Sequence, residues 1–241
     1  MAATQAPEIL GNQRTQEEVL EGLAEAVNHR KWFASFATPY LGEHPIEIGS
    51  GFGDYAEEWL PGVQRYTATE AEPERLVALK ERFAEHPKVE VRELLLPCQD
   101  GGSHSALVTF NVLEHIQDDV AALRSMADLV RPGAPIVLVV PAFQFAMSHV
   151  DIATGHVRRY TRKTMTTAIS NAGLIPERVH YVNSLGLIGY YSATSIFKLT
   201  PKPGAMVRFY DKFVTPISRL AESILRPPFG QSVFAVARKP E

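Results

Sequence analysis

The sequence predicts an α/β protein built on a doubly wound, largely parallel sheet. Three observations predict it: short apolar strand-like runs alternate with helix-like runs, a glycine-rich turn follows the first strand, and residues 135–140 are almost entirely apolar. Alternation at this spacing is typical of consecutive strand–helix–strand units, and an uninterrupted apolar strand is covered on both faces. Ligands of such sheets bind beyond the carboxyl ends of the strands.

Each element has a local signal. An apolar stripe predicts a helix over residues 17–36, and Pro61-Gly62 and Pro132-Gly133 end later helices. We expect strands over 45–49, 65–69, 89–93, 105–110, 135–140, 178–183 and 232–238, and further helices over 54–60, 73–86, 118–130 and 161–172.

The last two strands are separated by a long segment. Residues 184–231 comprise 48 residues, and insertions of this length usually form lids or binding walls. We therefore divide the chain into an N-terminal helical lid (1–44), a core (45–183), an acceptor-side cap (184–231) and the final strand of the core (232–241).

Composition excludes several classes of protein. The 241 residues carry 24 Lys plus Arg and 27 Asp plus Glu, a net charge of -3, so a strongly basic nucleic-acid binder is disfavoured. Cys98 is the single cysteine, which leaves no intrachain disulfide and no cysteine-rich metal site. The first 30 residues hold no secretory apolar core, and the most apolar later stretch is too polar to span a membrane. We expect a cytoplasmic protein without a transmembrane span.

The glycine-rich turn carries the first functional signal. Glu47 stands in the first strand, and Gly49, Gly51 and Gly53 alternate after it, with Ser50 between the first two. Because position 54 is Asp54 rather than glycine, the run departs from the dinucleotide G-x-G-x-x-G pattern. Such glycines let the backbone approach a ligand closely, although a tight structural turn alone would also explain them.

Glu70 strengthens the ligand interpretation. It ends the second strand, where its two carboxylate oxygens can accept hydrogen bonds from both hydroxyls of a ribose. Together with the glycine turn, it favours a nucleoside-like cofactor without phosphates.

These motifs resemble the class I S-adenosylmethionine-dependent methyltransferases, in particular the small-molecule type of the methyltransferase 11/12 families. The resemblance runs from about Trp32 to the C-terminus, and its strongest parts are residues 47–53, 111–116, 129–133 and 155–161. It implies a Rossmann-like seven-stranded sheet with the last strand antiparallel, and S-adenosyl-L-methionine as cofactor, with S-adenosyl-L-homocysteine as product.

The resemblance also implies roles for individual residues. Gly49, Ser50, Gly51 and Gly53 would lie near the methionine part and ribose, Glu47 would anchor the loop or accept from an ammonium, and Glu70 would hold the ribose. Ala71 would border the adenine, Leu95 and Leu96 would pair with its edge through the backbone, and Asn111 and Val112 would approach the methionine amino group. Trp32 would close the cofactor mouth, unless it belongs to a stripe between helix and sheet. Ser105 replaces an aspartate that many relatives carry.

The acceptor side is expected around three histidines. His115 follows the fourth strand and can act as general base, unless it only packs the loop, and His149 and His156 are the alternatives. Arg159 is expected to bind an anionic acceptor and Tyr160 to wall the cofactor pocket, unless an arginine locks the loop by pairing with a carboxylate and Tyr160 belongs to the core. Tyr190 of the cap is expected to contact the acceptor. We expect no metal site, because the spacing of His149, Asp151 and His156 is loose and no cysteine supports it.

The sequence thus predicts an enzyme that methylates oxygen or carbon of a small organic acceptor, with aromatic acceptors included. A noncatalytic cofactor-binding or interaction protein with the same fold remains the alternative, and an NAD-dependent oxidoreductase is opposed by Asp54. A homodimer is possible, and nucleic acid is the weaker substrate.

Overall fold

A computed structural model of the chain describes residues 9–200 and 204–241. It confirms the α/β architecture: one seven-stranded sheet has the order β3-β2-β1-β4-β5-β7-β6. The strands are β1 (Pro45–Ile48), β2 (Tyr66–Glu70), β3 (Val89–Glu93), β4 (Ala106–Phe110), β5 (Pro135–Pro141), β6 (Ile175–Val182) and β7 (Ser232–Arg238). The first five form parallel pairs, and β7 runs antiparallel between β5 and β6, as predicted.

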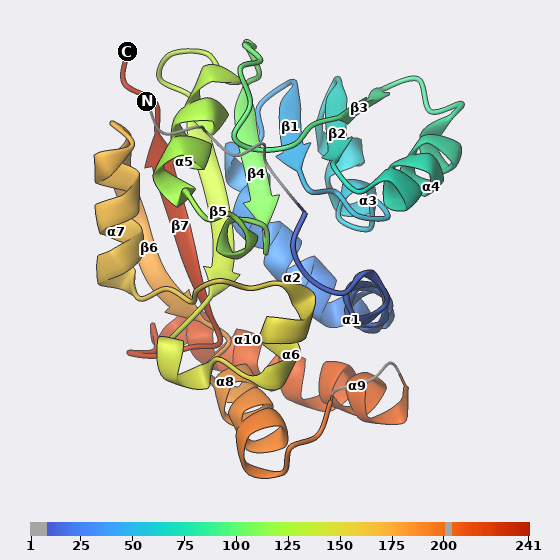
Figure 1. Ribbon diagram of the computed structural model, residues 1–241, viewed down its shortest axis with the longest axis vertical. Helices are drawn as coiled ribbons and strands as arrows, with labels where there is room; N and C mark the ends of the chain where they lie inside the picture. The colour runs from blue at the N-terminus through green and yellow to red at the C-terminus, as the bar shows by residue number, and fades with distance from the viewer. Residues whose placement is uncertain (1–8, 201–203) are drawn as a thin grey trace.

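Helices cover both faces of the sheet (Figure 1). On one face, α5 (Asp119–Asp128) and α7 (Arg162–Asn171) pack on side chains such as Ile136 and Leu138 of β5. On the other face, α2 (Val27–Ala37), α3 (Ala56–Trp59) and α4 (Pro73–Phe83) contribute buried residues to a second core cluster, which includes Val137 and Val139 of β5. Because successive residues of β5 point to opposite faces, its continuous apolar run is what a doubly covered strand needs.

The N-terminal segment is two helices where we predicted one. The chain breaks at Ala26 between α1 (Gln13–Glu25) and α2, with ψ of 68°. The backbone N–H groups of Asn28 and His29, in the first turn of α2, donate to the Asp211 carboxylate at 2.9 and 2.8 Å. A carboxylate from the cap therefore stabilises the start of this helix, a contact that no local pattern reveals.

Two other segments differ from the predicted elements. A short helix, α6 (His149–Thr154), precedes α7 and begins with a capping box between Ser148 and Asp151. The cap consists of α8 (Ser184–Tyr191), a π-helical segment at Ser192–Ile196, α9 (Ala205–Phe209), a second π-helical segment at Tyr210–Val214, and α10 (Thr215–Ile224). Figure 1 shows this cap at the end of the sheet where β4 and β5 terminate.

None of the helices within residues 9–200 and 204–241 combines the length and apolarity required to cross a lipid bilayer.

Candidate functional site

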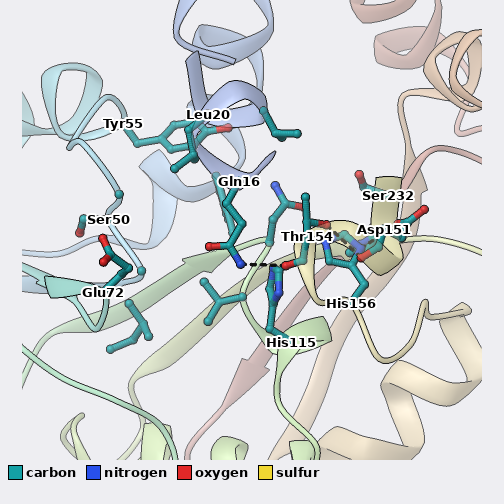
Figure 2. Close-up of a pocket in the computed structure, with 18 of the residues that line it drawn as sticks. Gln16, Leu20, Ser50, Tyr55, Glu72, His115, Asp151, Thr154, His156 and Ser232 are labelled. Carbon is teal, nitrogen blue, oxygen red and sulfur yellow. Dashed lines mark hydrogen bonds and ion pairs between the residues drawn. The ribbon is translucent and has the colours of Figure 1, made fainter. Parts of the chain in front are cut away.

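A cavity of about 1480 Å³ lies at the carboxyl ends of the central strands. Its walls come from the glycine turn after β1, the ends of β2 and β4, helix α1, the loop around α6, and the cap. Figure 2 shows these groups converging, with Ser50 and Glu72 on one side and His115, Asp151 and His156 on the other. The predicted ligand end of the sheet is thus the end that holds the cavity.

The glycine turn lies directly against this cavity. Gly49 has a φ of +72°, and a Cβ built on it would lie 2.5 Å from the Cγ2 of Val112, so no other residue fits without displacement. Gly51 has a φ of +57° and borders Leu20 of α1. Glycine is required at position 53 for a different reason, because a Cβ built there would meet the ring of Phe83 at 2.5 Å. Gly53 does not line the cavity. The expected cofactor contact of Gly53 is therefore wrong, because this glycine serves helix packing.

Glu70 joins the turn to the second strand. One of its carboxylate oxygens accepts from the N–H of Gly51 at 2.9 Å, and the other accepts from the N–H groups of Ala71 and Glu72 at 3.0 Å each. Arg75 lies 3.4 Å from the second oxygen. The carboxylate of Glu70 therefore lines the cavity in an orientation fixed by these contacts. Glu72 caps α4 by accepting hydrogen bonds from the N–H groups of Glu74 and Arg75.

Glu47 is buried beneath the turn. It is 3% exposed and accepts a hydrogen bond of 2.5 Å from the Tyr66 hydroxyl. Burial raises its pKa to about 7 despite that hydrogen bond. A cation arriving at this carboxylate would favour its ionised form.

The remaining predicted cofactor residues fall into two groups. Those that line the cavity, besides Glu47, Gly49, Gly51 and Glu70, are Ser50, Ala71, Leu95, Leu96, Asn111 and Val112. Trp32 does not: it is 4% exposed and packs against Phe33 and Phe36 in the core between α2 and the sheet. The expected aromatic closure by Trp32 is therefore wrong, because the break at Ala26 makes α2 a core helix and leaves the covering position to α1.

Helix α1 covers the cavity through polar contacts. Gln16 donates to the carbonyl oxygens of Leu10 and Thr154 at 2.8 Å each and accepts from Arg75 at 3.2 Å. One side chain therefore connects the cofactor half of the cavity, at α4, with the histidine half, at α6 (Figure 2). Residues 1–8 of the predicted lid lie outside the described part of the chain.

The structure brings two of the three predicted histidines together. The rings of His115 and His156 lie 4.6 Å apart, edge to face, on the cavity wall. His149 is exposed, contacts Thr200 at 3.1 Å and does not line the cavity, so its expected catalytic position is wrong. Burial lowers the pKa of His115 to about 3, which keeps the imidazole neutral at physiological pH.

Asp151 organises the acceptor side of the cavity. One carboxylate oxygen lies 2.7 Å from His156 Nδ1 and 2.7 Å from the Arg159 guanidinium. The other accepts from the Ser148 N–H at 2.7 Å and from the Tyr190 hydroxyl at 2.9 Å. Hydrogen bonds from His156 and the charge of Arg159 hold the pKa of Asp151 well below its usual range, against the opposing effect of burial.

Two predicted acceptor residues must be corrected. Arg159 lines the cavity, but its guanidinium is paired with Asp151 and donates to the Ala142 carbonyl at 3.1 Å, so it locks the loop rather than awaiting an anion. Tyr160 is 2% exposed, lies in the core and donates to Asp119 at 2.8 Å, away from the cavity. Tyr190 does line the cavity, with its ring 4.8 Å from the Arg159 guanidinium carbon.

A potential metal-binding group appears beside the two histidines. One ligand atom from each of Glu114, His115 and His156 lies within 4.8 Å of the other two. Glu114 is fully buried, and neither of its carboxylate oxygens has a hydrogen-bond partner in the described residues. Burial raises its pKa to about 7. The loose sequence spacing of His149, Asp151 and His156 gave no indication of this cluster, because it joins two separate loops.

Several cavity residues were missed by sequence reasoning. They are Gln16, Leu20, Glu72 and Arg75, whereas Asp151 was named only as a metal-ligand candidate. Asp151 carried a detectable signal, since Ser148 precedes it by three residues in a capping-box pattern. The placement of α1 over the cavity depends on long-range contacts and has no comparable local signal.

Comparison with known proteins agrees with the site. Residues 46–136 match a family model described as a methyltransferase domain (Methyltransf_12). An uncharacterized methyltransferase of Mycobacterium bovis is 25% identical over 151 residues, which span 59% of this chain and 59% of that relative.

Two solved structures share the fold. A chain from the complex between the Haloferax volcanii Trm112 methyltransferase activator and a methyltransferase is 16% identical, with a TM-score of 0.62 over 94% of this chain and 98% of that one. Geranyl diphosphate methyltransferase in complex with S-adenosylmethionine is 12% identical, with a TM-score of 0.58 over 87% and 85%. The strand order and the glycine turn agree with the similarity to a methyltransferase domain that the family model finds over residues 46–136.

Proposed function

We propose that this protein is an S-adenosylmethionine-dependent methyltransferase that acts on oxygen or carbon of a small, largely apolar organic acceptor. The observation that carries the proposal is a single cavity that extends from the glycine turn and Glu70 to the His115–His156 pair and the cap. A methyl donor and an acceptor must lie in contact for transfer, and one continuous cavity permits this.

The residues present fit the cofactor. A Cβ at Gly49 would collide with Val112, so the turn leaves room that only glycine provides, and Glu70 is fixed at its edge by three backbone N–H groups. In the proposed complex, Glu70 holds the ribose, Ala71, Leu95 and Leu96 border the adenine, and Asn111 and Val112 lie near the amino acid part. When bound, the cofactor supplies a methyl group activated by a positively charged sulfur.

The protein's own contribution is positioning and exclusion of water. Gln16 and Leu20 of α1 close one side of the cavity, and Tyr190, Met206 and Tyr210 of the cap close another. Aligning two bound reactants in this way can lower a barrier by several kcal/mol, about 7 or more in favourable cases. The wall of aromatic and aliphatic side chains favours an acceptor with an apolar body.

The direct test is calorimetric titration with S-adenosylmethionine, S-adenosylhomocysteine and NAD, followed by mass-shift screening of phenolic, polyketide and quinone-like acceptors. We expect binding of the first two compounds alone and a gain of one methyl group on an acceptor. Cofactor binding without transfer to any acceptor would instead support a noncatalytic binding protein. Because a structural neighbour is in complex with a Trm112 activator, the screen should be repeated with such a protein added.

A further inference from the structure

The buried carboxylate of Glu114 has no hydrogen-bond partner among the described residues, which indicates that it binds a ligand. A fully buried carboxylate without hydrogen bonds is costly, and within the described residues both of its oxygens lack a partner. The Nε2 of His156 lies 3.8 Å from one of these oxygens, beyond hydrogen-bond distance. The three groups therefore surround a position that none of them fills.

The geometry points to a divalent metal site formed by Glu114, His115 and His156, suited to Zn²⁺ or a similar first-row ion. Two imidazoles and one carboxylate are a donor set typical of catalytic sites, which keep a fourth position open. Ligand atoms around a tetrahedral ion lie roughly 3.3 Å apart. The atoms here lie within 4.8 Å of one another, so binding would need only a modest contraction.

Asp151 supplies the second feature of such a site. It lies 2.7 Å from His156 Nδ1, which leaves Nε2 directed toward Glu114. A carboxylate behind a ligating histidine fixes the orientation of its ring and raises its basicity. Asp151 is itself held by Arg159 and Ser148, so the imidazole is in place before any ion arrives.

The open position of this site would face the cavity, since His115 and His156 line it. There a hydroxyl of the acceptor could bind the ion and lose its proton to solvent, with the electron pair of the broken O–H bond remaining on oxygen. This consequence rests on the proposed function, whereas metal binding itself does not.

The test is titration of the full chain, stripped with a chelator, with Co²⁺ followed by visible absorption and with Zn²⁺ followed by calorimetry. We expect one ion per chain, and at least about tenfold weaker binding in both Glu114→Gln and His156→Gln. His149→Gln, an exposed histidine outside the cluster, is the matched control and should bind like the unaltered protein. A thermal melt of each variant establishes that it is folded.

Absence of binding in the unaltered chain, or equal binding in the two cluster variants and the control, would overturn the metal site. Separate titration with S-adenosylmethionine keeps the outcomes distinct: a chain that binds the cofactor but no metal retains the proposed function and loses this inference.

A second, independent observation concerns the outer face of the cap. An apolar stripe runs continuously through α9, the π-helical segment and α10, with a spacing of three or four residues that places its members on one side. These residues are between 50% and 74% exposed: Met206, Phe209, Phe213, Ile217, Leu220 and Ile224. The inner side is polar, with Asp211, Thr215 and Ser218 at most 5% exposed. This helical segment therefore presents its apolar side to the outside, the reverse of an ordinary surface helix.

The exposed charged side chains within the segment itself are all basic, and Arg208 among them pairs with Glu25 of α1. Lys212, Arg219 and Arg226 are exposed, whereas the acidic residues of the segment face inward: Asp211 accepts from α2, and Glu222 accepts from the N–H groups of Asn183 and Ser184. The segment is thus locally basic on a chain of net charge -3. A symmetric dimer through this stripe would bring like charges together, which disfavours a second copy as the occupant.

We infer that the stripe docks the cap onto an anionic lipid surface. An apolar side with flanking lysine and arginine is the composition of segments that lie in a membrane interface. The cap also reaches the cavity: Met206 of the stripe and the neighbouring Tyr210 form part of the cavity wall. An acceptor with an apolar body could then enter from the lipid side.

The test is co-sedimentation of the full chain with vesicles of phosphatidylcholine alone or with about 30% phosphatidylserine. We expect binding to the anionic vesicles that weakens with salt, and a loss of about tenfold or more in the double variant Phe213→Ser/Ile217→Ser. Val77→Ser, which alters an apolar residue 56% exposed on α4, is the matched control and should bind unchanged.

No binding to either vesicle, or an equal loss in the control, would overturn this inference. So would a concentration-dependent dimer, seen by sedimentation velocity, that the double variant abolishes, because the stripe would then bind a second copy.

Discussion

The two halves of the cavity hold their carboxylates in opposite ways. On the cofactor side, Glu70 is held mainly by N–H groups of its own neighbourhood and of the adjacent turn. On the acceptor side, Asp151 is held largely by side chains, including Arg159 and Tyr190 from separate elements, and Glu114 has no hydrogen-bond partner in the described residues. Backbone contacts fix the first half whatever the acceptor, whereas the second can be altered one side chain at a time.

The largest expected effect on stability lies on the acceptor side of the cavity, where side chains hold Asp151. Asp151→Ala would leave the Arg159 guanidinium, only 3% exposed, without its partner, and would remove the capping contact of α6. We expect the free energy of unfolding to fall by about 3–5 kcal/mol, measured by chemical denaturation. Glu43→Ala, which breaks the exposed ion pair with Arg131, should leave the free energy of unfolding nearly unchanged. Equal losses in the two variants would contradict the role of Asp151 as the organising group.

A glycine substitution tests the cofactor side of the cavity, where backbone contacts dominate. In Gly49→Ala, the left-handed φ of +72° and the collision with Val112 act together. We expect the free energy of unfolding to fall by about 3 kcal/mol and the affinity for S-adenosylmethionine to fall as well. Gly173→Ala meets a similar φ of +82° with nothing within 4 Å, so it should lower stability slightly and leave binding unchanged. Unchanged calorimetric affinity in Gly49→Ala would remove the turn from the cofactor site.

The pH dependence of stability tests the burial of Glu47. Since its folded pKa is raised from 4.5 to about 7, the unfolded chain releases this proton first as pH rises, and stability decreases across that window. Glu47→Gln has no proton to lose. Between about pH 4.5 and pH 8, the unaltered protein should therefore lose about 2–3 kcal/mol relative to the variant, measured by denaturation at both ends. Parallel pH profiles would show that the carboxylate is solvated.

The contrast between the halves also explains what the sequence could predict. The strands, the glycine turn and Glu70 follow from local patterns, because short apolar runs and the conformational needs of glycine are set within a few residues. The seven strands and the antiparallel direction of the last one agree with the prediction.

The failures share one physical cause, which is long-range contact. Trp32 became a core residue because Asp211, far along the chain, stabilises the start of α2 and separates it from α1. Gln16 reached the cavity through Thr154 and Arg75, neither of which is near it in sequence. The cluster of Glu114, His115 and His156 joins two separate loops, so no spacing rule could reveal it.

A smaller effect is expected at Glu70. Glu70→Ala removes an acceptor from the N–H groups of Gly51, Ala71 and Glu72 and the proposed contact with ribose. We expect calorimetry to show S-adenosylmethionine binding weakened by about 1–3 kcal/mol, the scale of lost hydrogen bonds to a charged group. Glu90→Ala, at an exposed carboxylate paired with Arg65, should leave the affinity unchanged. An unaltered dissociation constant in Glu70→Ala would restrict this residue to a structural role.

The smallest effect tests where the acceptor half ends. Tyr160 donates to Asp119 at 2.8 Å and lies in the core, so Tyr160→Phe removes one hydrogen bond and keeps the ring packing. Denaturation should show a loss of about 1 kcal/mol. Binding of cofactor and acceptor should be unchanged, whereas Tyr190→Phe, at the cavity wall, should weaken acceptor binding because it releases one contact of Asp151. If both variants weakened acceptor binding equally, the cavity would extend to Tyr160, and the division between core and acceptor wall would need to be redrawn.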